Sequence, residues 1–148
     1  MKIDTINWKI LDCLQQNARQ SNTDIARKVG VSSPAVAERI RKLEDAGIIK
    51  GYFAKLSHLE TGHQLKAIIT LRAFMGMLKP FIQKVKSFSE VVNCYRITGN
   101  ENIVMEVVLS NQQHLEQFID QLITYGETRT HIVLSNITES NPIVEKLS

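Results

Sequence analysis

The stretch SSPAVAERIRKLEDAG, residues 32–47, carries the signals of one short cationic helix. Ser32 can accept hydrogen bonds from the unpaired N–H groups of a first turn, and Pro34 fits that turn because it lacks an N–H. Apolar side chains recur at helical spacing and form one narrow stripe to bury, namely Val36, Ile40 and Leu43. Gly47 can end the helix, since glycine enters the left-handed conformation without strain. The opposite side is basic, and a basic exposed helix suits the DNA major groove.

The composition is typical of a globular protein. The 148 residues suffice for one ordinary domain or two small ones, and 43% are hydrophobic against 22% charged. No apolar run approaches the roughly 18 residues of a membrane span. Acidic residues interrupt the apolar N-terminal stretch, so we expect a cytoplasmic chain without a signal peptide. Cys13 and Cys94 are isolated, which favours small buried apolar roles over a disulfide or a metal site.

The positive charge is confined to the first third of the chain. Residues 1–50 contain nine Lys and Arg against six Asp and Glu, whereas residues 51–148 contain nine of each. The formal net charge of +3 therefore belongs to the N-terminal part. This asymmetry indicates an anion-binding half, most simply one that binds nucleic acid, joined to an electrically neutral half.

Two further helices are predicted before the cationic one. Apolar residues at helical spacing predict a helix over residues 4–18, and Ser21 with Asp24 forms a start signal for another over 22–29. Gly30 then breaks the helical pattern. Two helices separated by a short glycine turn, the second one basic, are typical of a helix-turn-helix. The alternative is a structural three-helix bundle whose positive charge only keeps one face solvated.

In a helix-turn-helix, the N-terminal part of the last helix faces base edges while flanking basic residues hold phosphates. We therefore predict a DNA-binding surface that begins at the capping Ser32. The predicted base contacts come from Ser33, Pro34, Ala35 and Glu38. The predicted phosphate contacts come from Arg27, Lys28, Arg39, Arg41 and Lys42. One such unit makes few contacts, so we expect two copies to act together on double-stranded DNA.

Residues 51–64 are predicted to form a hinge strand and a linker. Residues 48–56 are rich in β-branched and aromatic side chains, whereas residues 57–64 are polar. His58 and His63 could suggest a metal pair, but no cysteine or carboxylate cluster accompanies them. We therefore expect exposed linker histidines.

The chain beyond the linker follows a βαββαβ pattern. The predicted strands cover residues 65–74, 91–98, 103–109 and 128–137, and the predicted helices cover 79–88 and 112–123. This order predicts a ferredoxin-like antiparallel sheet with both helices on one face. Residues 103–109 and 131–134 are apolar on both strand faces, so we expect the open face to meet another copy. Glu106 and His131 interrupt these faces. Each could form hydrogen bonds at the interface, lie exposed at a sheet edge, or act in effector binding or catalysis.

The predicted fold class is α+β. A three-helix, winged-type helix-turn-helix domain spans residues 1–50, and the hinge of 51–64 joins it to a ferredoxin-like dimerisation and effector-sensing domain over 65–138. Residues 139–148 form a polar tail. The four histidines are scattered, and the sequence has no glycine-rich phosphate loop, nucleophile elbow or metal-ligand cluster. We therefore expect no enzymatic activity, no cofactor and no metal.

The N-terminal residues, from 4 to 52, resemble the Lrp/AsnC, or feast/famine, transcription regulators. The pattern includes Ile10-Leu11, Ile25-Ala26, Val29-Gly30-Val31-Ser32, Arg39-Ile40, Leu43-Glu44 and Ala46-Gly47-Ile48-Ile49. The resemblance continues less strongly over residues 65–137. It implies a hinge strand that pairs with its equivalent in a partner chain, and homodimers that assemble into octameric discs which wrap or bend DNA.

The resemblance also implies a small-molecule site. The turn at 98–102 resembles the Gly-x-x-Asp loop that helps to bind an amino-acid effector between subunits, and the segment before the last strand lines the same cleft. The implied effector residues are Thr98, Gly99, Asn100, Glu101, Asn102, Gly126, Thr128 and Thr130. Asn102 departs from the pattern, because an amide offers an ammonium group only a neutral, weaker hydrogen bond. A regulator without an effector and a regulator with an unusual ligand both fit this departure.

We expect a sequence-selective, DNA-binding transcription regulator that acts at the nucleoid and is modulated by an amino acid or a related small molecule. A nucleoid-associated DNA-wrapping protein with weak sequence preference shares the same features. An alternative from another class is a small ligand-binding or catalytic ferredoxin-like protein, whose N-terminal bundle only docks it to a partner.

Overall fold

The computed structural model describes residues 2–146, which divide into two units, each with a core of its own. One unit comprises the described residues up to Ala54 together with those from Thr138 onwards, and the other comprises Lys55–Ile137. The boundary between Ala54 and Lys55 falls inside residues 51–64, which the sequence predicts to be hinge and linker. None of the described helices is long and apolar enough to cross a membrane.

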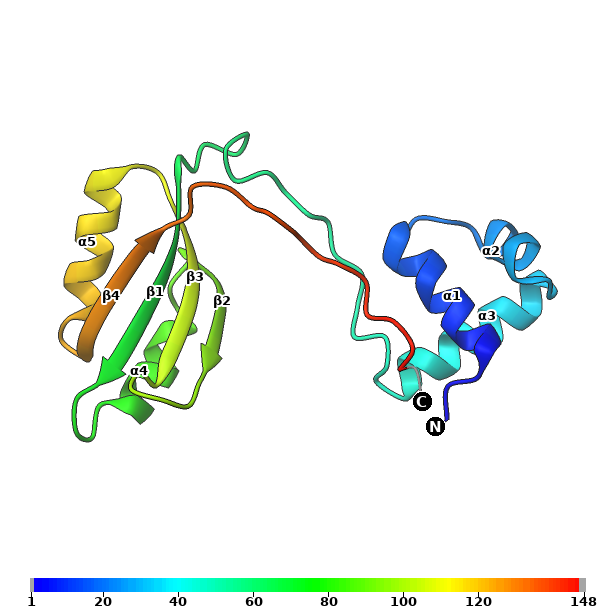
Figure 1. The fold of residues 1–148 in the computed structure, drawn as a ribbon, viewed down its shortest axis with the longest axis horizontal. Coiled ribbons are helices and arrows are strands. Elements are labelled where there is room, and N and C mark those ends of the chain that lie inside the picture. The colour runs from blue at the N-terminus through cyan, green and yellow to red at the C-terminus, as the bar shows by residue number, and fades with distance from the viewer. Residues whose placement is uncertain (1, 147–148) are drawn as a thin grey trace. The chain divides into compact units, whose positions relative to one another are not determined.

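The N-terminal unit contains three helices, α1 (Thr5–Gln16), α2 (Asn22–Val29) and α3 (Ser33–Asp45), shown in blue to cyan in Figure 1. A side-chain oxygen caps the start of each, from Asp4, Ser21 and Ser32 respectively. The caps at Ser21 and Ser32 are those predicted from the sequence. The first helix is shorter than predicted because Asn17 has an extended backbone, with φ of −154°.

Glycines in the left-handed conformation follow α2 and α3. Gly30 has φ of 77°, and its N–H donates to the carbonyl of Ala26 at 2.9 Å. Gly47 has φ of 68°, and the next N–H, that of Ile48, donates to Leu43 at 2.9 Å. The chain therefore turns where the glycines predict. The helices enclose a small apolar cluster formed by Ile10, Ile25, Ala26 and Val36.

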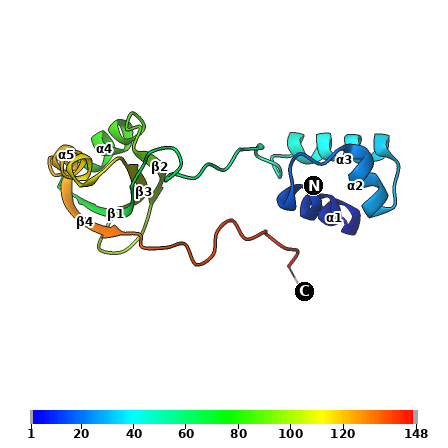
Figure 2. The same cartoon turned by 90° about the horizontal axis from the view of Figure 1, so that it is seen from above.

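The C-terminal unit has the predicted βαββαβ order. Its elements are β1 (Leu65–Ala73), α4 (Leu78–Val85), β2 (Val91–Arg96), β3 (Ile103–Leu109), α5 (Gln112–Leu122) and β4 (Gly126–Ile132). The strands pair antiparallel in the order β2-β3-β1-β4. Figure 2 shows α4 and α5 on the same face of the sheet. The ferredoxin-like prediction is therefore confirmed.

Apolar side chains fill the space between the sheet and its two helices. Phe118 of α5 packs edge-on against Phe88, with ring centroids 5.3 Å apart. Phe81 of α4 meets Tyr125 in the same way, at 5.5 Å. The alternate residues of β1 and β3 that face these rings are buried, which agrees with the period of two in a strand.

Two predicted strands differ from the structure by more than two residues, whereas β1 and β2 end one and two residues before their predicted ends. The last strand, predicted over 128–137, is observed at Gly126–Ile132, where it pairs with β1 from Ala73 back to Ala67, and one more hydrogen bond, from the N–H of Val133 to Lys66 at 2.9 Å, follows its end. Residues 48–56, predicted to be extended and to supply the hinge strand, form no strand among the described residues. A strand needs a hydrogen-bonding neighbour, and this single chain supplies none to that segment.

The C-terminal segment, predicted as a polar tail, contacts α1. The side-chain amide of Gln15 donates to the carbonyl of Ile143 at 2.9 Å, and the N–H of Ile143 donates back to Gln15 Oε1 at 2.8 Å. Ile3 and Trp8 line a shallow hollow together with residues 143–146. The side-chain amide thus pairs with the segment as a neighbouring peptide group would.

Candidate functional site

The exposed side of α3 carries a row of paired charges. Glu38 Oε1 lies 2.8 Å from Arg41 Nη2 and 3.5 Å from Lys42 Nζ, and Arg41 Nη1 lies 2.9 Å from Asp45 Oδ2. The hydrogen bond from Arg41 lowers the pKa of the Glu38 carboxyl and, reciprocally, raises the pKa of Arg41. All these side chains are exposed, so water screens the pairs and a phosphate can replace a carboxylate at little cost.

The residues predicted to contact bases occupy the first two turns of α3. Pro34 and Glu38 are exposed, whereas Ser33 and Ala35 are half-buried. The hydroxyl oxygen of Ser32 accepts the N–H of Ala35 at 3.3 Å, which makes it the helix cap. The N-terminal half of α3 is therefore a surface of small side chains with one carboxylate.

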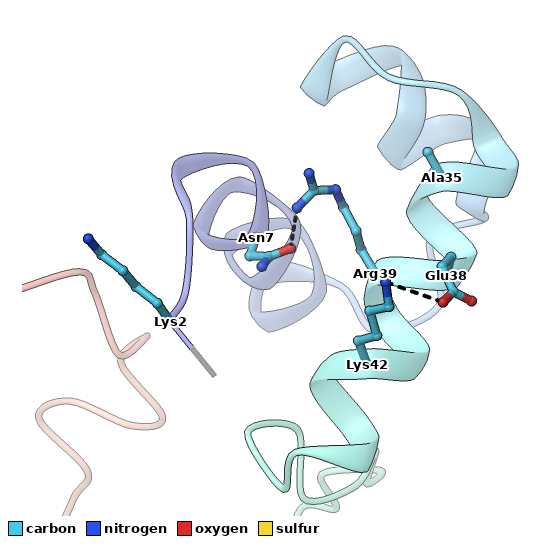
Figure 3. A pocket seen from close by; sticks show the side chains of 6 residues that line it. All are labelled: Lys2, Asn7, Ala35, Glu38, Arg39 and Lys42. Atoms are coloured by element: carbon cyan, nitrogen blue, oxygen red, sulfur yellow. Dashed lines mark hydrogen bonds and ion pairs between the residues drawn. The ribbon is translucent and has the colours of Figure 1, made fainter.

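Figure 3 shows a hollow beside this surface, lined by Lys2, Asn7, Ala35, Glu38, Arg39 and Lys42. Predicted base-contacting and phosphate-contacting residues thus share one concave face. Lys2 lies on this face as well, although the sequence analysis did not select it. Lys2 precedes the first predicted helix, so the helical patterns that identified the other basic residues do not include it.

Arg39 points toward α1 instead of along the exposed row. Its Nη1 lies 2.7 Å from Asp4 Oδ2 and 2.8 Å from Asn7 Oδ1. Its side chain is 30% exposed, against 60% for Arg41. Three residues assigned to phosphates from one helix therefore divide into two exposed cations and one that links α3 to α1.

The remaining predicted phosphate contacts lie in the last turn of α2. Arg27 Nη1 lies 3.6 Å from Asp24 Oδ1, and Lys28 Nζ donates to Gln20 Oε1 at 2.6 Å. Both side chains are exposed. Because both lie near the C-terminal end of α2, their positive charges also interact favourably with the helix dipole. This structural role is independent of any ligand.

The turn predicted to bind an effector connects β2 to β3, and Asn102 anchors it to the end of β1. Its Oδ1 accepts the N–H of Ala73 at 2.8 Å. Its backbone N–H donates to Leu71 at 2.9 Å, and its carbonyl accepts the N–H of Ile97 at 2.8 Å. One lone pair of the side-chain oxygen is thus used within the fold.

The fold brings the two parts of the predicted effector site to one end of the sheet. Gly126 pairs with Ala73, the residue that Asn102 also contacts. Arg129 Nη1 lies 3.5 Å from Glu101 Oε1. The exposed turn residues at this end are Thr98, Gly99 and Asn100.

The segment predicted to precede the last strand is instead part of it. Gly126, Thr128 and Thr130 all belong to β4, because the ladder with β1 begins at Gly126. A Cβ at position 126 would overlap the carbonyl of Arg72, so only glycine fits there. This glycine has a packing reason that does not depend on an effector.

Glu106, one of the two groups whose role the sequence left open, has partners on the neighbouring strands. Glu106 lies 2.5 Å from Lys66 Nζ and accepts from Asn93 Nδ2 at 3.0 Å. These bonds lower the pKa of the Glu106 carboxyl, chiefly through the Lys66 hydrogen bond.

Cys13 and Cys94 are free thiols, half-buried beside the two cores. Within residues 2–146, no group of three or more His, Cys, Asp or Glu could hold a metal ion.

Comparison with known proteins gives the same division of the chain. Residues 3–50 match a winged helix-turn-helix DNA-binding family, and residues 66–143 match the Lrp/AsnC ligand binding domain. Among curated relatives, the uncharacterized HTH-type transcriptional regulator YezC of Bacillus subtilis is 35% identical over 134 residues, which are 90% of this chain and 95% of YezC.

Solved structures of similar proteins have the same fold. LrpC of Bacillus subtilis is 29% identical, with a TM-score of 0.89 over 93% of this chain and 99% of LrpC. The transcriptional regulator NMB0573 of Neisseria meningitidis, in an L-Met complex, is 26% identical, with a TM-score of 0.91 over 96% of each chain. The two domain matches and these relatives show that the chain belongs to the Lrp/AsnC family of DNA-binding, helix-turn-helix transcription regulators.

Proposed function

We propose that this regulator recognises specific DNA sites as a homodimer, with α3 of each copy in the major groove. The observation that carries this proposal is the exposed N-terminal half of α3. There, Ala35 and Glu38 lie on one face, and Glu38 is paired with the exposed cations Arg41 and Lys42. A methyl group can contact thymine and a carboxylate can accept from cytosine, so this surface has groups that read bases as well as groups that hold phosphates.

The phosphate contacts in this proposal come mainly from Arg41 and Lys42, supported by Arg27 and Lys28 on α2. Their present partners are exposed carboxylates and an amide, which are weak competitors for a phosphate. Such a regulator would act on the nucleoid, in the cytoplasm, and would need no catalytic group.

A second copy is proposed because large apolar side chains lie exposed in segments with no partner strand. On the linker side these are Phe53, 87% exposed, and Leu56, 74% exposed. Beyond β4, Leu134 is 94% exposed. Pairing of these segments between copies would bury the apolar side chains and would give the predicted hinge strand the hydrogen-bonding neighbour that a strand needs. Assembly of such dimers into octamers is part of the same proposal.

The direct test measures binding to a duplex that the wild-type protein enriches from a random-sequence pool, over a series of salt concentrations. The double variant Arg41→Ala, Lys42→Ala should bind the enriched duplex and a scrambled duplex more weakly. Its salt slope should be smaller by about 1.8, or about 0.9 for each lost phosphate contact. The matched control is Lys79→Ala, Lys86→Ala, which removes two exposed cations near the ends of α4 and should leave the slope unchanged.

The same measurement separates the regulator from a DNA-wrapping protein. A specific regulator binds its site about a thousandfold or more tightly than random duplex. Equal affinity for the enriched and the scrambled duplex would favour wrapping with weak sequence preference. No binding to either duplex would contradict the proposed function and favour a protein whose N-terminal unit only docks it to a partner.

We also propose that the C-terminal unit binds an amino acid or a related small molecule at the end of the sheet where Asn102 and Gly126 meet Ala73. The match to a ligand binding domain and the L-Met complex of the Neisseria meningitidis relative support this. Because Asn102 carries no charge, it would attract an ammonium group less than a carboxylate does. Calorimetry with each common amino acid on the wild type and on Asn102→Asp tests it. Heat from neither protein would favour a regulator without an effector.

A further inference from the structure

We propose that Arg39 is a positioning residue that fixes the orientation of α3 against α1, and that it does not bind a DNA phosphate. This inference rests on the proposed function, since it concerns how the recognition surface is held. Arg39 therefore has a different role from its neighbours Arg41 and Lys42, although its charge and its position in the sequence are similar to theirs.

The contacts of Arg39 form a closed network with the start of α1. Asp4 uses both carboxylate oxygens: Oδ1 accepts the N–H of Asn7 at 2.7 Å and so caps α1, while Oδ2 lies 2.7 Å from Arg39 Nη1. The same nitrogen donates to Asn7 Oδ1 at 2.8 Å. The guanidinium thus binds the capping residue and a first-turn residue of α1 together.

Asn7 makes this network costly to open. It is 5% exposed, and it is the one buried polar side chain among the residues that the structure describes. A buried amide that loses its hydrogen-bond partner keeps its desolvation cost without compensation. If Arg39 moved out to a phosphate, Asn7 would lose the donor to its side-chain oxygen. Asp4 is as exposed as Glu38, so the cost comes from Asn7, and Arg41 and Lys42 incur no such cost because the partners of both are exposed carboxylates.

The small size of the N-terminal core explains why one network can set the orientation of α3. Two side chains of α3 are fully buried, Val36 and Leu43, and Val36 belongs to the apolar cluster that α3 shares with α1 and α2, with Ile40 packed at its side. These side chains form one narrow stripe, which holds α3 against its neighbours but fixes its rotation about its own axis less tightly than a broad apolar face would. Arg39 lies within one turn of Ala35 and Glu38, so a rotation that breaks its bonds would move both of these side chains from their places on the recognition surface.

The variant Asp4→Asn separates the two roles of Arg39 by the sign of its effect. Asparagine caps a helix as well as aspartate does, so α1 keeps its cap while Arg39 loses its counter-charge. If Arg39 positions α3, affinity for the duplex enriched by the wild type should fall about tenfold, as for one lost base contact. Affinity for the scrambled duplex and the salt slope should stay unchanged. If Arg39 binds phosphate, removal of a nearby acid should leave both affinities equal to those of the wild type or raise them.

Two further variants make the test independent of folding defects. Asp45→Asn removes an exposed acid from α3 and should raise affinity for both duplexes equally, without a change in their ratio. Arg39→Lys keeps the charge, but its ammonium ends one bond short of the Nη1 atom that contacts both Asp4 and Asn7. Positioning predicts that it loses selectivity at a constant salt slope, whereas a phosphate ligand would retain both. Thermal unfolding by circular dichroism identifies the temperature range in which each variant is folded.

A structural readout distinguishes failure of this inference from failure of the proposed function. Residual dipolar couplings of backbone amides, measured on the full chain without DNA, report the orientation of α3 relative to α1, including its rotation about its own axis. A changed orientation in Asp4→Asn and Arg39→Lys, but not in Asp45→Asn, supports the positioning role even if the wild type enriches no duplex. An unchanged orientation in both variants overturns it, whatever the DNA measurements show.

Discussion

The two units of this regulator differ in what holds them together. Among the described residues, the main cluster of the C-terminal unit contains twelve buried apolar side chains, while that of the N-terminal unit contains four. The sheet is also fixed by three antiparallel ladders. The helical unit instead adds polar networks at its rim, such as that of Asp4, Asn7 and Arg39. The position of a site on the larger core is therefore set by backbone pairing, and on the smaller core by a few side chains.

The two candidate sites reflect this difference. The DNA-binding surface is drawn mainly from α3, so its residues are neighbours in the sequence. The proposed effector site is drawn from the turn at 98–102 and from β4, and these meet only because β1 pairs with both β3 and β4. A sequence motif can therefore reveal the first site, whereas the second depends on strand register.

The largest expected effect is the loss of a core ring from the C-terminal unit. Phe118→Ala should reduce the free energy of unfolding of that unit by about 3–5 kcal/mol, because it removes a fully buried ring and leaves a cavity. Urea unfolding followed by circular dichroism measures this. The fluorescence of Trp8, the single tryptophan, reports the N-terminal unit, whose transition should stay in place. The control Ile123→Ala, at the half-exposed end of α5, should cost well under half as much.

A smaller effect is expected from the polar anchor of the effector turn. Asn102→Ala should destabilise the C-terminal unit by about 1–3 kcal/mol, because the N–H of Ala73 loses its acceptor. Asn102→Asp supplies an oxygen at the same place and should cost less. Asn100→Ala, on the exposed part of the same turn, is the control and should leave the urea midpoint unchanged. Equal midpoints for all three variants would contradict the anchoring role of Asn102.

The helical unit was predictable because its signals are local. Ser21, Gly30 and Gly47 mark helix starts and ends within a few residues, and the observed α2 has the predicted bounds. The inward direction of Arg39 was not predictable, since a helical wheel places it on the flank of the stripe and its partner Asp4 lies 35 residues earlier. Local charge counts grouped it with Arg41.

The C-terminal unit was predictable in its order of elements but not at its strand ends. Alternating and continuous apolar runs identified all four strands, yet the start of β4 at Gly126 follows from its register against Ala73. A single sequence contains no record of which residues of two strands face each other. The pairing of Gln15 with Ile143, 128 residues apart, was hidden for the same reason.

The Asp4 network predicts a pH dependence confined to the N-terminal unit. The N–H of Asn7, and then Arg39, hold the pKa of the Asp4 carboxyl below its ordinary value of 3.8. A carboxyl whose pKa is lowered by folding stabilises the folded state above its unfolded pKa, and this stability is lost as the pH falls through the folded pKa. Wild type should therefore unfold at higher urea than Asp4→Asn at pH 7, with the difference shrinking below about pH 4. Trp8 fluorescence measures both midpoints, and a difference that is independent of pH would contradict the charged interaction.

The smallest expected effect concerns the C-terminal segment on α1. Gln15→Ala removes both hydrogen bonds to Ile143, and these are exposed to water, so we expect no measurable change in the urea midpoint. The segment should nevertheless leave the hollow that it shares with Trp8, which makes the indole more accessible to solvent. Quenching of Trp8 by acrylamide should therefore be faster in Gln15→Ala, and equally fast in a chain that ends at residue 137. Gln16→Ala, on the next position of α1, should quench like the wild type. If Trp8 of the shortened chain is quenched at the same rate as in the wild type, the segment does not cover Trp8. In that case the C-terminal segment does not protect the helical unit, and the network of Asp4, Asn7 and Arg39 is the polar contact that matters for its small core.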